Sequence, residues 1–193
     1  MRHIYRCVLA CCVAAATGHA FADEQNIFAF GGRYTNQYFE YTFNPFTVGY
    51  EDNYVLGAGY QQFALGHDGG LKLGVELGAA LRLGNQTSGE LWVGPVLRAD
   101  GLIQTHQVKV SVSVTAGLSV TTDTIGIERA REIEMGGDST LLYYLAPEVS
   151  VSFANNPDLE YFARVHHRSG GWESLGNMRD GANAASVGVR WNL

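Results

Sequence analysis

The sequence contains three cysteines, Cys7, Cys11 and Cys12, and none after residue 12. All three lie in the first 22 residues, which have a basic start, an apolar run and small side chains at Ala20 and Ala22, as a secretory signal does. Because we expect this segment to be removed, the mature chain has neither a disulfide framework nor a thiolate for catalysis or metal binding. Its stability must come from packing and hydrogen bonding.

A lipid-anchored alternative uses Cys11 as the modified residue after Val8, Leu9 and Ala10. It leaves almost no apolar run ahead of the cleavage site, so cleavage after residue 22 is favoured. Either processing route predicts that the chain is exported.

The remaining chain also lacks a long apolar run. No segment beyond the signal approaches the roughly 18 residues of a membrane-spanning helix, so any membrane insertion must use strands. Residues 23–193, which we expect to form one domain, carry 11 Lys and Arg against 19 Asp and Glu, since Arg2 and Arg6 belong to the signal. The resulting net charge of −8 argues against a nucleic-acid partner. Walker loops, dinucleotide fingerprints and metal-ligand spacings are absent, so we predict no cofactor and no metal.

Two long stretches alternate with a period of two. In residues 71–83, leucine, valine and alanine occupy every second position, with Lys72, Glu76 and Arg82 between them, and residues 108–120 repeat the pattern. This period predicts strands with one apolar and one polar face. Both stretches exceed the usual soluble strand of about 5–6 residues and match the roughly 9–11 residues that cross a bilayer. Six less regular strands are predicted at residues 26–34, 53–63, 90–99, 140–153, 159–169 and 184–193.

An even number of strands predicts an all-β fold, a closed eight-stranded antiparallel transmembrane β-barrel in the outer membrane of a Gram-negative bacterium. Closure satisfies every backbone N–H and C=O where no water is present. The predicted connections alternate between short ones (64–70, 100–107, 154–158) and long ones (35–52, 121–139, 170–183), with 84–89 as the exception. Short inner turns and long outer loops are expected of such barrels. We predict local bulges at Pro95 and Pro147, because proline removes a ladder donor.

The polar faces should then point into the barrel, where charged side chains have to pair. We expect a salt-bridged plug rather than an open pore, formed by Lys72, Glu76, Arg82, Lys109, Glu148, Glu160, Arg164, His166 and Arg190. A soluble β-sandwich or periplasmic lipid-binding barrel is the alternative, and it requires the apolar faces to turn inward.

The end of the seventh predicted strand carries the residues with the clearest chemistry. Alternation places His167 and Ser169 on the outward face, and extending the last strand backward brings Asn183 to the same face. A serine hydroxyl is a weak nucleophile until a base accepts its proton, and the imidazole base needs a third group to fix its tautomer. The three residues could supply these roles at the level of the lipid headgroups.

This region resembles the C-terminal signature of the PagL-type lipid A 3-O-deacylases, also called acyloxyacyl-hydrolase-like barrels. The resemblance covers Val165 to Gly170, a long loop, the segment from Asp180 to Asn183 and a final strand. It implies a serine esterase that removes an ester-linked 3-hydroxyacyl chain of lipid A, with His167 as base and Ser169 as nucleophile. The family's asparagine after the serine is replaced by Gly170, and its glutamate position falls on Asn183.

Asparagine can orient an imidazole but cannot stabilise an imidazolium by charge. Glu173 and Asp180 are therefore alternative acids, with Glu173 preferred because it keeps a glutamate. The backbone N–H of Gly170 is a predicted oxyanion donor. Arg168, beside His167, is a predicted ligand for a lipid phosphate, because a guanidinium matches phosphate geometry.

The expected partners are lipid A or lipopolysaccharide and the outer membrane, and a homodimer is left open. The alternative function is a non-catalytic barrel that serves envelope integrity or surface interaction through the loops at residues 35–52 and 121–139. The position of His167 and Ser169 separates the two, because side chains that point into the barrel could not reach a lipid.

Overall fold

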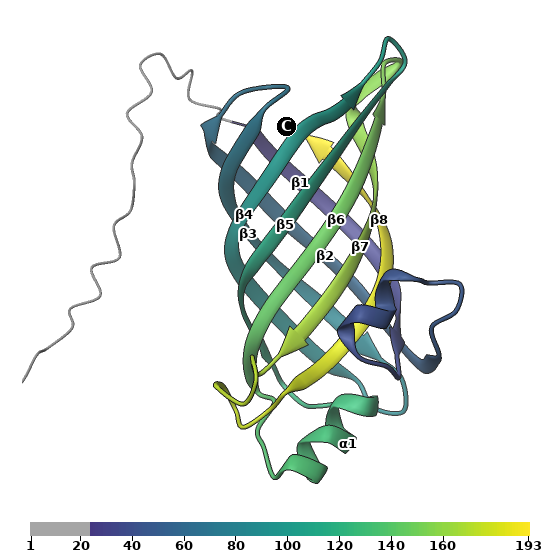
Figure 1. The fold of residues 1–193 in the computed structure, drawn as a ribbon, viewed down its shortest axis with the longest axis vertical. Helices are drawn as coiled ribbons and strands as arrows, with labels where there is room; N and C mark the ends of the chain where they lie inside the picture. The colour runs from purple at the N-terminus through teal and green to yellow at the C-terminus, as the bar shows by residue number, and fades with distance from the viewer. Residues whose placement is uncertain (1–23) are drawn as a thin grey trace, which may run out of the picture.

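The computed structural model describes residues 24–193, so the predicted signal at residues 1–22 lies outside the described part of the chain. Eight antiparallel strands form a closed barrel in chain order (Figure 1). They are β1 (Glu24–Thr35), β2 (Tyr50–Gly66), β3 (Leu71–Leu83), β4 (Ser88–Gln104), β5 (Val108–Thr121), β6 (Leu141–Phe153), β7 (Asn156–Ser169) and β8 (Asp180–Asn192). Pairing of β1 with β8 closes the ring, from Asn26 opposite Asn192 to Thr35 opposite Asn183. The predicted fold class is confirmed, and each predicted strand overlaps an observed one.

The apolar faces of the strands form the outer wall. On β3, Leu71 is 64% exposed while its neighbour Lys72 is 2% exposed, and the alternation continues along the strand. Large apolar side chains are exposed around the barrel, among them Ile27, Leu56, Val75, Leu91, Leu97, Val149 and Val187. The soluble alternative, which requires these faces to turn inward, is therefore wrong. Such a wall suits a hydrocarbon surrounding.

Ion pairs fill the interior, as predicted. Arg164 donates to the two oxygens of Glu76, both at 2.9 Å, and lies 2.7 Å from Glu148. Arg190 bridges Glu148 and Glu160 at 2.7 and 3.1 Å. Buried charges are tolerated only when they are paired and hydrogen-bonded, so the inner face is a salt-bridged plug.

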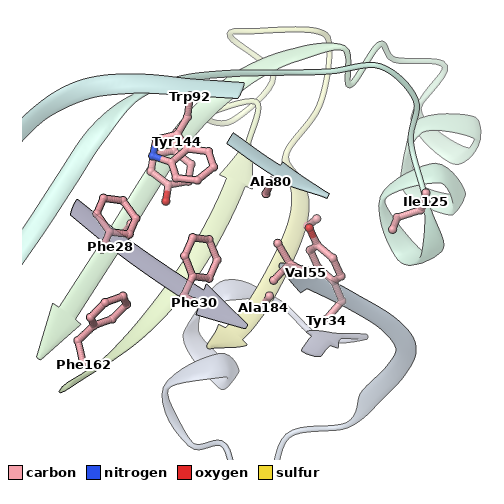
Figure 2. Packing of buried hydrophobic residues seen from close by; sticks show 12 residues of the cluster. Phe28, Phe30, Tyr34, Val55, Ala80, Trp92, Ile125, Tyr144, Phe162 and Ala184 are labelled. Carbon is pink, nitrogen blue, oxygen red and sulfur yellow. The ribbon is translucent and has the colours of Figure 1, made fainter. Parts of the chain in front are cut away.

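A cluster of buried aromatic rings also lies inside the barrel (Figure 2). Phe30 lies edge-on to Trp92 with 6.0 Å between ring centres, and the Arg164 guanidinium lies 4.7 Å from the centre of the Phe28 ring. The ring quadrupole attracts the cation at this distance. Rings and ions together occupy the space that side chains are expected to fill in an eight-stranded barrel.

Three long connections gather at one end of the barrel, which we call the loop end (Figure 1). The β1–β2 connection contains a 3₁₀ helix, η1 (Phe39–Phe43), the β5–β6 connection contains α1 (Gly126–Met135), and the third joins β7 to β8. Short turns and the C-terminus lie at the other end, which confirms the predicted asymmetry. No helix in residues 24–193 is long and apolar enough to cross a membrane.

Helix α1 is attached to the barrel mouth by Glu128. Its carboxylate accepts hydrogen bonds from Arg82, at 2.5 Å, and from Arg168, and all three side chains are buried. Residues 121–139 were predicted only as a loop. The run from Glu128 to Glu134 is rich in glutamate and arginine, which favour helices, and was the available signal.

The predicted bulges at Pro95 and Pro147 are wrong. The β4–β5 ladder lacks pairs at Gly94 and Pro95, but the register is the same on both sides of the gap. The β6–β7 ladder likewise lacks pairs at Ala146 and Pro147 without a shift. Each proline costs the ladder a donor toward one neighbouring strand and pairs in register with the other, so no extra residue is inserted.

Candidate active site

The predicted site residues lie where β7 ends and β8 begins, at the loop end. His167 is opposite Asn183, and Ser169 is opposite Asp180. Two residue steps on β7 therefore face three on β8, which is a β-bulge. Regular alternation would put Asp180 and Asn183 on opposite faces of β8. The bulge brings their side chains together.

The imidazole of His167 lies beneath the β1–β2 connection. It is 7% exposed, and the centre of the Phe39 ring is 4.3 Å from its own. Its Nδ1 lies 2.5 Å from Oδ1 of Asn183, which is fully buried. The structure thus brings together the residues expected to be base and orienting group.

The amide of Asn183 determines the tautomer of His167. Asn183 Nδ2 donates to Oδ2 of Asp180 at 2.9 Å and to the backbone oxygen of Gln37 at 3.0 Å. Both partners are acceptors, so the amide nitrogen must face them and the amide oxygen must face the imidazole. Nδ1 therefore carries the hydrogen, and Nε2 keeps its lone pair. A general base needs that free lone pair.

Ser169 shares a groove with His167. This groove, which we call the site groove, has a volume of about 540 Å³. It is lined by Tyr38, Phe39, Glu40, Ala116, Tyr143, Tyr144, Leu145, His167, Ser169, Gly171, Trp172, Arg179 and Asp180. In the described part of the chain no hydrogen bond joins the Ser169 hydroxyl to the imidazole, and such contacts often tighten only when substrate binds.

A second groove lies on the apolar wall formed by β5 to β8. This wall groove has a volume of about 520 Å³ and is lined mainly by apolar side chains, among them Phe43, Pro45, Val112, Pro147, Val149, Ala163, Val165, Ala185 and Val187. Residues of η1 and its flank border both grooves, since Phe39 lines the site groove and Phe43 the wall groove.

Arg131 of α1 supports the rear of the site. Its guanidinium lies 3.3 Å from Oδ2 of Asp180 and donates to the backbone oxygens of Gly181, at 2.7 Å, and Gln37, at 3.2 Å. It also lies over the Tyr38 ring, 4.8 Å from its centre. Arg131 was not predicted as a site residue, because no local pattern links α1 to the start of β8.

The predicted headgroup contact by Arg168 is wrong. Its side chain is fully buried inside the barrel, where it donates to Glu128, to the hydroxyl of Ser119 at 2.5 Å and to the backbone oxygen of Ser139 at 2.8 Å. Alternation along β7 turns Arg168 inward, opposite to its two neighbours. A lipid phosphate on the outer wall cannot reach it.

The other predicted groups lie in the β7–β8 connection. Glu173 forms an exposed ion pair with Arg179 at 2.6 Å, so the carboxylate beside His167 belongs to Asp180 and not to Glu173. Gly170 is buried beneath this connection, where an added Cβ would meet the backbone oxygens of Met178 and Leu175. Gly171, with φ of 58°, lines the site groove in its place. The oxyanion role of the Gly170 N–H stays a prediction.

No family model matches this chain, and no curated protein matches it. Solved structures share its fold. The outer membrane enzyme PagL superposes with a TM-score of 0.58 at 16% identity, covering 87% of this chain and 99% of that chain. Neisserial surface protein A (NspA) gives 0.53 at 12% identity over 91% and 99%, and a de novo designed transmembrane β-barrel gives 0.50 at 12% identity over 91% and 100%. At these identities the likeness concerns the fold alone. With its closed ring of eight strands and its apolar outer wall, the chain is a β-barrel of the outer-membrane type.

Proposed function

We propose that this barrel is a lipid A 3-O-deacylase, a serine esterase that acts on lipid in the outer leaflet. One observation carries the proposal: His167, with its Nε2 lone pair free, shares an outward groove with Ser169 at the loop end of a lipid-facing wall. A base and a hydroxyl inside the barrel would be sealed from lipid, whereas both of these side chains line a groove on the outer face, with Phe39 covering the imidazole. The resemblance of the sequence around both residues to the PagL-type enzymes gives the substrate class.

The chemistry follows from the roles of these two side chains. Ser169 Oγ attacks the ester carbonyl while His167 Nε2 accepts the hydroxyl proton, which gives a tetrahedral intermediate. The C–O bond to the sugar then breaks, and the imidazolium returns its proton to the leaving 3-hydroxyl. Water, deprotonated by His167, next attacks the acyl-serine; the bond from the acyl carbon to Ser169 Oγ breaks, the imidazolium returns its proton to Oγ, and the 3-hydroxy fatty acid leaves. Asn183 holds the imidazole through both steps.

The wall groove offers a place for the acyl chain. It lies on the lipid-facing surface and is bordered, like the site groove, by the η1 segment. Its small side chains, Ala163 and Ala185, leave a depression between bulkier neighbours. Apolar contact along it would hold a chain whose ester lies at Ser169.

Arg179 takes the place of Arg168 as the guanidinium that a lipid phosphate can reach. It lines the site groove, and its side chain is 72% exposed. Its partner Glu173 is also partly exposed, so a phosphate could replace that carboxylate without uncovering a buried charge.

The test compares lipid A from outer membranes that contain the wild-type barrel, Ser169→Ala or His167→Gln. We expect the wild type to remove one 3-hydroxyacyl chain, visible by mass spectrometry, and both variants to leave lipid A intact. His106→Gln is the matched control, because His106 is an exposed histidine in the β4–β5 turn at the other end of the barrel.

Unchanged lipid A in membranes that contain folded wild-type barrel would contradict the proposal. The alternative would then be a non-catalytic barrel that acts in envelope integrity or surface interaction through its long loops.

A further inference from the structure

The group that holds the imidazole in the candidate site, Asn183, carries no charge. An imidazole that takes a proton becomes a cation, and the usual third group is a carboxylate that stabilises this cation by its charge. Asn183 holds Nδ1 through a neutral amide oxygen, so it can orient the ring without supplying charge. A nearby carboxylate would have to supply it.

Asp180 has the required position. Its Oδ2 accepts a hydrogen bond from Asn183 Nδ2 at 2.9 Å, and its Oδ1 lies 3.6 Å from His167 Nδ1. The residue is 8% exposed. Within residues 24–193, Oδ1 is a buried oxygen without a hydrogen-bond partner, although an unsatisfied buried acceptor is costly. The unpaired oxygen is the one directed at the imidazole.

Arg131 contacts only one of the two carboxylate oxygens of Asp180. Its guanidinium lies 3.3 Å from Oδ2, the oxygen that also accepts from Asn183. Both contacts fall on Oδ2, so Oδ1 remains for His167. The β-bulge between β7 and β8 makes the arrangement possible, because it places Asp180 and Asn183 on one face.

We propose that Asp180 is the acidic positioning residue of this site. It orients the Asn183 amide so that Oδ1 of Asn183 faces the imidazole, and its charge stabilises the imidazolium that forms when Ser169 loses its proton. Asn183 and Asp180 together perform the work that one glutamate performs in the family this chain resembles. The effect on rate rests on the proposed function, whereas the tautomer of His167 does not.

The kinetic test is a double-mutant cycle on Asp180 and Asn183, with purified protein in detergent and lipopolysaccharide as substrate. Asp180→Asn should lower kcat about 10-fold or more with little change in KM, because the loss falls on the charged state of the base. Asn183→Glu places a carboxylate at the imidazole itself. In that background Asp180→Asn should cost less than about 3-fold, since coupled residues are not additive.

A merely structural role for Asp180 predicts equal losses in both backgrounds, and that result would overturn the proposal. So would full activity of Asp180→Asn, or a loss that falls on Glu173→Gln instead. Asp158→Asn is the matched control, because Asp158 is exposed at the opposite end of β7.

A second measurement needs neither activity nor a substitution. The ¹⁵N chemical shifts of labelled His167 in the wild-type barrel should show hydrogen on Nδ1 and a free Nε2. Hydrogen mainly on Nε2 would overturn the proposal, even in an active protein. Hydrogen on Nδ1 in a barrel that leaves lipid A unchanged would refute the proposed function and keep the arrangement of Asp180, Asn183 and His167.

Discussion

Removing the charge of Glu128 tests whether its buried ion pairs attach α1 to the barrel. Its carboxylate is buried between Arg82 of β3 and Arg168 of β7, and we consider Glu128→Gln. Breaking a buried ion pair by removing one charge costs about 3–5 kcal/mol, because the remaining charge is left uncompensated. Glutamine has nearly the same shape and keeps one acceptor oxygen, which offsets part of that cost.

Both arginines also have other partners. Arg82 donates to the Tyr34 hydroxyl at 3.0 Å and lies 3.8 Å from Glu90, while Arg168 keeps its contact with Ser119. We therefore expect Glu128→Gln to lower the free energy of unfolding by about 2–3 kcal/mol, less than the full cost of a broken buried pair. The loss should be global, because the uncompensated charges lie on barrel strands.

The assay is urea unfolding in detergent micelles or lipid vesicles, followed by tryptophan fluorescence. Glu134→Gln is the matched control, since Glu134 lies exposed on the same helix, and it should unfold like the wild type. Equal midpoints for Glu128→Gln and Glu134→Gln would refute the conclusion that a buried ion pair attaches α1 to the barrel mouth.

Three further predictions concern the site and the loops. Under the proposed function, Phe39→Ala should expose the His167 imidazole and lower kcat for lipid A deacylation several-fold. An unchanged rate would show that the aromatic cover has no role. Ala185→Trp should fill the wall groove and raise KM for lipopolysaccharide, while kcat for a short soluble ester stays near that of the wild type. Parallel losses on both substrates would contradict binding of the acyl chain in the wall groove. Hydrogen bonds with the side chain and the backbone N–H of Thr140 lower the pKa of Asp138, in the β5–β6 connection, below its ordinary value of 3.8. The stabilisation from these contacts is therefore present above pH 3.8 and is lost as the pH falls through the lower pKa of the folded protein. A ¹³C carboxyl titration of Asp138 with a midpoint at or above 3.8 would contradict this.

Much of the fold is encoded locally. A period of two assigns every second residue to one face, so Leu71 and Lys72 could be placed on opposite sides of the wall before any contact was known. The same rule predicted that His167 and Ser169 share the outward face. Alternation also places Arg168 on the inward face. The prediction that Arg168 binds a headgroup ignored this rule, and it was wrong.

Other features depend on contacts between residues that are distant in the chain. Alternation along β8 alone places Asp180 and Asn183 on opposite faces of the strand. The bulge between β7 and β8 brings them to the same face. Phe39 reaches His167 from the β1–β2 connection, and Arg131 reaches Gly181 from α1. Loop residues have no fixed period, so their partners were not predictable from spacing.

Local periodicity was therefore enough for the eight strands, the direction of their faces and the shared outward face of His167 and Ser169, because backbone geometry alone sets those directions. The partners of the imidazole required the folded barrel. Closure of the ring, one bulge and the packing of two loops bring Asn183, Asp180 and Arg131 to His167, and each of these contacts is made across strands or between a loop and the wall.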